Sequence, residues 1–324
     1  MRALVLGGTG WAGRAVVEHL LEGGAEVTCL ARGESGTVPE GARLVRADRL
    51  SPGAYKAVHG EWDEVIELSH ELDLVEPALD ALADAAAHWT LVSTVSVYAR
   101  NDEPGADETA DVVEPTDLSK YADAKVAAER SSAARLGSRL LIGRPGLIVG
   151  PGDPSDRFGY WPARLSGTGP VLTPTTSGRF VQVIDVADLA AWIGQAARAG
   201  HSGVVNAVGE SVALADFLRT VASVTGFNGE LVEVEDSELL AHDVRYWAGP
   251  RSLPLWLPLS DAAFAQRSSC AFSRTGGRVR PLGATARSVL EDERARSLDR
   301  VRRSGLSASE ERAVLRQVRR RTSR

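Results

Sequence analysis

Short apolar runs alternate with amphipathic segments through the first half of the chain. Residues 3–6 predict a strand buried on both faces, and apolar residues recur at helical spacing from Ala15 to Leu21. Further buried strands are expected at residues 26–32, 42–48, 63–69 and 89–93, with an alanine-rich helix at 74–88. Strands that alternate with helices predict an α/β fold built on a doubly wound parallel sheet.

A glycine-rich turn separates the first strand from the first helix. Gly7, Gly8, Gly10 and Gly13 follow the strand directly. Such a turn has no side chains where a pyrophosphate must approach the backbone, and the helix N-terminus offers N–H groups and a positive dipole end. We therefore expect this turn to bind a dinucleotide through Gly7, Thr9, Gly10, Trp11, Ala12 and Gly13.

The ends of the next strands carry polar residues that face the same ligand. Arg32 follows the second strand, where an acidic residue would bind the ribose 2′-hydroxyl of NAD. An arginine pairs instead with a 2′-phosphate, so NADP(H) is expected rather than NAD(H); the alternative is a solvated arginine at a strand end. Asp48 and Arg49 are expected beside the adenine. Residues expected near the pyrophosphate are Leu68, Ser69 and His70.

The second half of the chain predicts a smaller α/β region. Strands are expected at residues 140–150, 180–185 and 203–208, and helices at 186–197, 213–225 and 281–294. Residues 1–150 are assigned to dinucleotide binding, and residues 151–324 mainly to substrate binding, interleaved with the first sheet. The loop at 151–162, which includes Arg157, either faces the substrate or packs on the surface; residues 244–259 form a lid or wall with part of their aromatics in the core.

A tyrosine and a lysine share one face of a predicted helix. Tyr121 and Lys125 are four residues apart in the segment 120–129. A tyrosine that transfers a proton near neutral pH needs its pKa lowered from about 10, and a neighbouring ammonium lowers it by favouring the phenolate. The same lysine can hydrogen-bond a ribose hydroxyl, and the Thr94 hydroxyl can hold the substrate oxygen that Tyr121 protonates.

Together these motifs resemble the extended short-chain dehydrogenases/reductases of the NAD-dependent epimerase/dehydratase family. The matching motifs are GGTGWAG at 7–13, STVSVY at 93–98, YADAK at 121–125, RPGLIVGP at 144–151 and VIDVAD at 183–188. The resemblance implies a Rossmann-type sheet and a homodimer through the helix that carries Tyr121. It also implies a catalytic triad of Thr94, Tyr121 and Lys125, a substrate contact at Ser96, and Pro145 and Gly146 against the nicotinamide.

Two departures from the family pattern reduce the range of reactions that we expect. Family dehydratases carry an Asp-Glu pair after the threonine, where this chain has Val95 and Ser96, so sugar dehydration is disfavoured. Family members that epimerise at an acidic carbon add a Cys or His base near this strand, and the strand carries none.

The composition of the chain limits the class of protein further. The chain has 324 residues, 44% hydrophobic and 25% charged, with a net charge of -6, which argues against binding nucleic acid through overall positive charge. Its two cysteines cannot form a disulfide framework, and neither a signal peptide, a bilayer-spanning run nor metal-ligand spacing is found, so a cytoplasmic protein without metal is expected. The basic end at 316–324 is interpreted as a solvated helix end rather than a contact for nucleic acid or an acidic partner.

The sequence therefore predicts an NADP-dependent oxidoreductase that reduces a carbonyl, or oxidises an alcohol, of a small molecule, with Tyr121 as general acid/base. The first alternative is an epimerase with tightly held NAD(P). A nucleic-acid-binding homologue without activity is the second, and the complete triad and the negative charge argue against it. The substrate is a nucleotide-sugar or, from the aromatics at 160–161 and 246–247, a natural-product ketone or alcohol.

Overall fold

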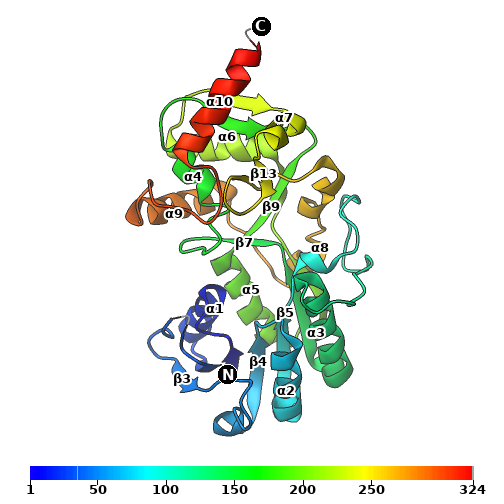
Figure 1. Cartoon of the computed structure of the whole chain (residues 1–324). Helices are drawn as coiled ribbons and strands as arrows, with labels where there is room; N and C mark the ends of the chain where they lie inside the picture. Colours follow the sequence, from blue (N-terminus) through cyan, green and yellow to red (C-terminus); the bar gives the residue numbers. More distant parts are fainter. Residues whose placement is uncertain (35, 323–324) are drawn as a thin grey trace. The chain divides into compact units, whose positions relative to one another are not determined.

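The protein is seen in a computed structural model that describes residues 1–34 and 36–322 (Figure 1). The chain divides into two compact units. Unit 1 comprises Met1–Ile148, Val183–Glu210 and Arg267–Val279, and unit 2 comprises Val149–Gln182, Ser211–Gln266 and Arg280–Arg324. The two units are described separately below.

Unit 1 is built on a seven-stranded sheet in the order β10-β6-β5-β4-β1-β2-β3, with every neighbouring pair parallel. Its strands are β1 (Arg2–Leu6), β2 (Glu26–Ala31), β3 (Arg43–Arg46), β4 (Trp62–Glu67), β5 (Ala86–Val92), β6 (Leu140–Pro145) and β10 (Gly203–Ala207). The predicted doubly wound parallel sheet is confirmed. Because all strands run the same way, their carboxyl ends lie at one edge of the sheet, where ligands bind in this architecture.

Helices cover both faces of this sheet. Alternation along β1 sends Ala3 and Val5 to a cluster with α1 (Trp11–Glu22) and α5 (Val186–Ala199). Leu4 and Leu6 point to a second cluster with α2 (Leu72–Leu82) and α3 (Tyr121–Leu136). The first strand is therefore buried on both faces, as its unbroken apolar run predicts. Shorter helical elements of unit 1 are η1 (Lys56–Val58), η2 (Ala83–Ala85), η3 (Val95–Val97), η4 (Gly137–Arg139) and α8 (Cys270–Arg274).

The alanine-rich helix predicted at 74–88 is wrong at its carboxyl end. The helix ends at Leu82, and after η2 the chain enters β5 at Ala86 rather than at residue 89. Ala86 pairs with Trp62, and His88 with Glu64, in the parallel ladder between β5 and β4. Sheet pairing of a buried segment outweighs the helix propensity of its alanines.

Unit 2 contains short strands and several helices. Val212 of β11 (Ser211–Ala213) pairs antiparallel with Val181 of β9 (Phe180–Asp185), while β12 (Leu231–Val234) pairs parallel with β8 (Val171–Pro174), and β13 (Arg245–Trp247) pairs parallel with β14 (Ser252–Pro254). Its helices are α4 (Tyr160–Leu165), α6 (Leu214–Thr225), α7 (Asp236–Ala241), η5 (Leu259–Ala265), α9 (Leu282–Ala295) and α10 (Ala308–Thr322). The strand predicted at 140–150 is divided into β6 and β7 (Leu147–Val149).

Most aromatic residues singled out in unit 2 are core residues. Tyr160 and Trp161 are buried in α4, and the Trp161 Nε1–H donates to the carbonyl oxygen of Pro254 at 2.8 Å. Trp256 is buried as well, and its ring centroid lies 3.9 Å from that of Tyr246. The interpretation of residues 160–161 as an aromatic substrate surface is therefore wrong, because apolar packing within unit 2 already occupies both rings.

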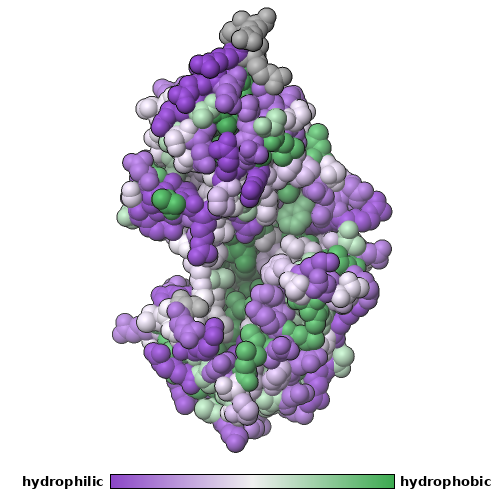
Figure 2. All heavy atoms as spheres, in the orientation of Figure 1, coloured by the Kyte–Doolittle hydropathy of each residue, from purple (hydrophilic) through white to green (hydrophobic). Residues whose placement is uncertain are grey.

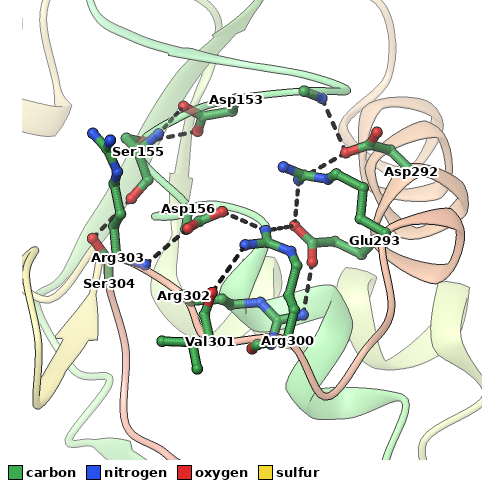
Figure 3. A network of polar contacts seen from close by, with 12 residues as sticks. Asp153, Ser155, Asp156, Asp292, Glu293, Arg300, Val301, Arg302, Arg303 and Ser304 are labelled. Atoms are coloured by element: carbon green, nitrogen blue, oxygen red, sulfur yellow. Dashed lines mark hydrogen bonds and ion pairs between the residues drawn. The ribbon is translucent and has the colours of Figure 1, made fainter.

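A buried carboxylate organises the loop before α10 (Figure 3). Glu293 of α9 is fully buried, and its two oxygens accept hydrogen bonds from three guanidinium groups at 2.7–2.8 Å. We call this group the Glu293 cluster; it consists of Glu293, Arg296, Arg300 and Arg302. Arg300 also pairs with Asp156, whose second oxygen accepts from the backbone N–H of Arg303 at 2.8 Å. The cluster ties α9 to two loops of the same unit.

Helix α10 begins with a capping box formed by Ser307 and Glu310. The Ser307 backbone N–H donates to the Glu310 carboxylate at 2.8 Å, and the Glu310 N–H donates to the Ser307 hydroxyl at 3.3 Å. Figure 2 shows that the visible surface along α10 is hydrophilic. Of the predicted basic end, residues 323–324 lie outside the described part of the chain, and Arg319 pairs with Glu230. In the described part of the chain, none of the helices is both long enough and apolar enough to cross a bilayer.

Candidate active site

The glycine turn between β1 and α1 is too closely packed for side chains. Gly7 has a φ of +95°, which only glycine adopts readily. A Cβ on Gly13 would lie 2.4 Å from the Gly7 carbonyl oxygen, and one on Gly8 would lie 2.6 Å from Cys29 Sγ. Helix α1 begins at Trp11, followed by Ala12. Its N-cap residue, Gly10, has no side chain that could accept hydrogen bonds from the first N–H groups of the helix. Backbone N–H groups, rather than side chains, are therefore available to bind an anion at the N-terminus of this helix.

A cavity of about 450 Å³ opens beside this turn within unit 1. It is bounded by the glycine turn and by the segments that follow β2, β3 and β4. Six of the residues predicted to bind the cofactor line it: Gly7, Thr9, Arg32, Asp48, Arg49 and Ser69. The cavity also has acidic lining residues that the sequence analysis did not single out: Glu34, Glu71 and Asp73.

Arg32 lines this cavity directly after β2, and its side chain already has an acidic partner. Its side chain is 61% exposed, and its Nε lies 3.2 Å from the Glu34 carboxylate. A second guanidinium is close by, because a Cβ on Gly33 would lie 2.8 Å from Nη1 of Arg46. Sequence reasoning missed Arg46; the signal was an arginine at the carboxyl end of the strand that neighbours β2.

Arg49 lines the cavity but donates all its hydrogen bonds within the protein. Its Nε donates to the Tyr55 hydroxyl at 3.0 Å, and Nη1 donates to Glu67 at 3.0 Å and to the Ser69 hydroxyl at 2.9 Å. Its Nη2 donates to Glu67 and, at 2.8 Å, to the carbonyl oxygen of Leu74. A guanidinium has five N–H donors, and these contacts use all five. Arg49 therefore contributes to the cavity wall as a guanidinium whose position is fixed by Glu67.

Lys125 joins the ends of β4 and β5. Its side chain is buried, and Nζ donates to the carbonyl oxygens of Val92 at 2.6 Å and Ser69 at 3.1 Å. Burial lowers the pKa of Lys125 to about 8, against the opposing effect of nearby carboxylates. The carboxylates are Glu67, Glu71 and Glu129. An ammonium with two donors fixed on the backbone keeps one for a ligand.

Tyr121 is the first residue of α3, and 49% of it is exposed. Lys125 Nζ lies 6.0 Å from the centroid of its ring, and the His70 ring meets it edge-on with centroids 5.1 Å apart. Burial and the charge of Lys125 both lower the pKa of His70. The structure thus brings His70 together with Tyr121 and Lys125, which the sequence predicts from a separate motif.

Thr94 and Ser96 lie where β5 gives way to η3. Thr94 is the N-cap of η3; its Oγ1 accepts from the Ser96 backbone N–H at 3.1 Å and donates to the Ser96 hydroxyl at 3.2 Å. Leu68 follows β4 and packs 3.5 Å from the position of a Cβ on Gly7. At the end of β6, the Gly146 N–H donates to the Ala207 carbonyl oxygen at 3.3 Å.

Arg157 belongs to unit 2. Its Nε donates to the Ser155 hydroxyl at 3.2 Å, and its guanidinium lies 5.2 Å from the centroid of a Trp247 ring. Its predicted substrate contact stays a prediction.

A carboxylate that the sequence analysis missed connects several of these segments. Glu129, one turn after Lys125 in α3, accepts hydrogen bonds from Ser93 and Arg144. The available signals were the spacing of Glu129 from Lys125 and a charged residue, Arg144, inside the apolar run of β6.

The parallel sheet, the glycine turn and the Tyr121–Lys125 pair define a dinucleotide-dependent enzyme of the short-chain dehydrogenase/reductase class. The chain belongs to the NAD-dependent epimerase/dehydratase family, whose model matches residues 3–209. It is accordingly an NAD(P)-dependent enzyme of the epimerase and reductase kind.

Two relatives illustrate the range of this similarity. The human epimerase family protein SDR39U1 is 28% identical over 252 residues, which cover 70% of this chain and 81% of that protein. A 2′-dehydrokanamycin reductase from Streptomyces kanamyceticus is 32% identical over 185 residues, covering 53% of this chain and 51% of that protein.

Solved structures share the fold at lower identity. The Thermus thermophilus UDP-glucose 4-epimerase in complex with NAD has a TM-score of 0.66 at 20% identity, covering 92% of this chain and 100% of that one. The Bacillus cereus UDP-glucuronic acid 4-epimerase in complex with NAD has a TM-score of 0.66 at 14% identity, covering 91% and 99%.

The residues present fit the NAD(P) cofactor that the family implies. The turn at Gly7–Gly13 has no room for a Cβ at two of its glycines, and the adjoining cavity of about 450 Å³ reaches Arg32 and Asp48. Close backbone, a helix N-terminus and a lined recess at the carboxyl edge of the sheet are the features that bind a dinucleotide.

Proposed function

We propose that the protein is an NADP-dependent oxidoreductase that reduces a carbonyl, or oxidises an alcohol, of a small molecule. The observation that carries the proposal is the pairing of a half-exposed Tyr121 with a buried Lys125 fixed on the carbonyl oxygens of Ser69 and Val92. When bound, the nicotinamide would supply or accept the hydride. The Tyr121 hydroxyl gives its proton to the substrate oxygen in reduction and takes one in oxidation.

The other catalytic residues prepare this proton transfer. The Lys125 ammonium, 6.0 Å from the centroid of the Tyr121 ring, favours the phenolate by its charge and uses its remaining donor on the ribose. Thr94 orients the substrate oxygen, and Ser96, which already shares a hydrogen bond with Thr94, contacts the substrate beside it. Arg157 of unit 2 is assigned a further substrate contact.

The cofactor is assigned along the carboxyl edge of the sheet. Arg32, with Arg46 beside Gly33, favours a 2′-phosphate and hence NADP(H) over NAD(H). Asp48 and Arg49 form the wall for the adenine, and Pro145 and Gly146 face the nicotinamide. Residues assigned to the pyrophosphate are the glycine turn with Thr9, Trp11 and Ala12, followed by Leu68, Ser69 and His70.

The substrate class is set by analogy with the relatives. The 2′-dehydrokanamycin reductase favours a carbonyl on a natural product, and the UDP-sugar epimerases favour a nucleotide-sugar. We assign cofactor binding to residues 1–150 and substrate binding mainly to residues 151–324, in a cytoplasmic protein that dimerises through α3. The second candidate function, an epimerase with tightly held NAD(P), is favoured by the similarity to SDR39U1 and to solved epimerases.

Cofactor binding by the purified protein tests both functions. The protein is examined for co-purified nucleotide by absorbance and then titrated with NADPH and NADH. Exchangeable NADPH that is oxidised in the presence of a carbonyl panel supports the reductase, and retained, non-exchanging cofactor supports the epimerase. Tyr121→Phe is the matched control: it keeps binding and loses turnover by about 10²- to 10⁴-fold, the range for one proton-transfer group. Failure to bind either nucleotide overturns both functions.

A further inference from the structure

We propose that Glu129 is a positioning residue, whose carboxylate holds together the three backbone segments that carry the catalytic and nicotinamide-facing residues. The inference rests on the proposed function, which assigns those roles to Thr94, Tyr121, Lys125, Pro145 and Gly146. It adds a residue that neither touches substrate nor donates a proton.

The geometry of the Glu129 carboxylate is that of a three-way clamp. Its Oε1 accepts from the Ser93 hydroxyl at 2.5 Å and from Arg144 Nε at 3.0 Å, and its Oε2 accepts from Arg144 Nη2 at 2.6 Å. The pair with Arg144 is bidentate, which fixes direction as well as distance. Only 5% of Glu129 and of Arg144 is exposed, so water does not compete for these bonds.

Each partner of this carboxylate is next to an assigned site residue. Ser93 directly precedes Thr94, and Arg144 directly precedes Pro145. Glu129 itself lies four residues, one helical turn, after Lys125 in α3. A shift at any of the three contacts therefore moves an assigned site residue by a similar amount.

A second layer of contacts holds Arg144 in place. Its guanidinium lies 4.9 Å from the centroid of the Tyr98 ring, and that of Arg267 lies 4.4 Å from the same ring. The Tyr98 hydroxyl donates to the Asn206 side chain at 2.6 Å, and the Asn206 backbone N–H donates to Glu108 at 2.7 Å. These contacts connect the Glu129–Arg144 pair to β10, the edge strand next to β6, and the charges of Glu129, Arg144 and Arg267 are all buried.

Stability alone is a weak reason for such a pair. Burying a carboxylate and a guanidinium costs desolvation that their attraction offsets only in good geometry, and apolar replacements are often equally stable. A bidentate, three-way contact instead defines the relative positions of β5, α3 and β6. This is the property that a site assembled from three segments needs.

The test compares Glu129→Gln with a matched control, Glu64→Gln. Glu64 is another buried carboxylate of unit 1, and it pairs across the sheet with His88, six residues before Thr94. Each variant is assayed for its thermal midpoint, for binding of NADPH and for binding of 2′,5′-ADP. The last probe contains only the adenosine half, whose cavity contains none of the three clamp residues.

We expect both variants to lose thermal stability, and only Glu129→Gln to lose NADPH affinity by about tenfold or more, the scale for losing a charged contact that positions a site. Its affinity for 2′,5′-ADP should stay within about threefold of wild type, since ~0.6 kcal/mol is within the scatter of such contacts. Equal losses for the two ligands, or an unchanged NADPH affinity, overturn the inference while wild-type binding still supports the proposed function. Wild-type protein that binds no NADPH overturns both.

Ser93→Ala keeps the test falsifiable if Glu129→Gln does not fold. It deletes one hydrogen bond and leaves the Glu129–Arg144 ion pair intact. We expect NADPH affinity to fall a few-fold with 2′,5′-ADP binding unchanged, consistent with a lost bond of about 1 kcal/mol. A loss shared equally by both ligands, or no loss, counts against the clamp.

The pH profile of NADPH binding provides a readout that a purely structural role would not change. The proposed function assigns one donor of the Lys125 ammonium to the ribose, and Glu129 is one of the carboxylates whose charge sustains that ammonium. Without that carboxylate the pKa of Lys125 falls further below about 8, so binding in Glu129→Gln weakens at a lower pH than in wild type. The groups that face Lys125 are Glu67, Glu71, Glu129, His70 and Tyr121. An unshifted profile contradicts the inference.

Discussion

Replacing Arg32 by alanine separates the two nicotinamide cofactors. A charged hydrogen bond to phosphate contributes about 1.5–3 kcal/mol. The Arg32 side chain is 61% exposed, so solvent screening places its contribution in the lower part of this range, about 1.5–2 kcal/mol. We therefore expect NADPH to bind roughly 10- to 30-fold more weakly. NADH lacks the phosphate and should change by less than about threefold.

Removing the charge of Glu34, the neighbour of Arg32, should have the opposite effect on NADPH affinity. The Glu34 carboxylate lies 3.2 Å from Arg32 Nε and must be displaced, or tolerated, when a phosphate arrives. An exposed ion pair contributes about 0.2–1 kcal/mol, so Glu34→Gln should tighten NADPH binding by about 1.5- to 5-fold. Two changes at one contact that move affinity in opposite directions are difficult to explain by unfolding.

Fluorescence titration of each variant with NADPH and NADH, at low and moderate salt, measures these changes. Arg43→Ala is the matched control, because it removes the same charge from β3 at a position three residues from Arg46 and hence on the other face of the strand. Equal losses for NADPH and NADH in Arg32→Ala would refute the assignment of the 2′-phosphate to this arginine. So would a loss in Arg43→Ala as large as that in Arg32→Ala.

Three further predictions concern the rest of the molecule. Gly13→Ala places a Cβ 2.4 Å from the Gly7 carbonyl oxygen, so we expect a loss of about 1–3 kcal/mol in the free energy of unfolding and no NADPH binding. A titration that shows retained NADPH binding would contradict the close packing of the turn. Glu293→Gln leaves the arginines of the Glu293 cluster without their carboxylate, and urea unfolding should show a loss of about 3–5 kcal/mol; a loss under about 1 kcal/mol argues that the cluster is solvated. Burial opposes charging of His88, but its bond to Glu64 outweighs burial and raises the pKa of His88. The folded protein therefore binds more protons than the unfolded chain, and its free energy of unfolding should fall as the pH rises from 6.5 through the raised pKa. The fall should be steeper in wild type than in His88→Gln, as measured by urea unfolding at several pH values. If the two proteins lose stability in parallel, the His88–Glu64 pair is not the cause.

The parts of the fold that follow local rules could be predicted from the sequence. The first strand, the glycine turn and the spacing of Tyr121 and Lys125 depend on residues within one or two turns of each other, and all are found as expected. The start of β5 could not be predicted, because Ala86 favours a helix until it pairs with Trp62, a residue far away in the chain.

The site shows the same division between local and long-range signals. Arg49 follows a strand end, as a ligand-binding arginine would, yet the choice of Glu67 and Tyr55 as its partners depends on the folded sheet. Glu129 is visible by its spacing from Lys125, and Arg144 as a charge within an apolar run, but nothing in the sequence says that the two residues meet. Pairings between distant segments depend on topology, which local patterns do not encode.

The path of the chain through unit 1 has a consequence for synthesis on the ribosome. The sheet lacks its edge strand β10 until Ala207 has been made, and α1 lacks its packing partner α5 until residue 199. Phe272 of α8 joins the same apolar cluster later still. Helix α1 packs on β1 and β2 as soon as these are made, but the part of its apolar surface that contacts α5 stays uncovered while much of the intervening chain emerges. A nascent or truncated chain ending near residue 150 therefore lacks part of one of its two apolar clusters, and the surface left exposed makes such a chain prone to aggregation.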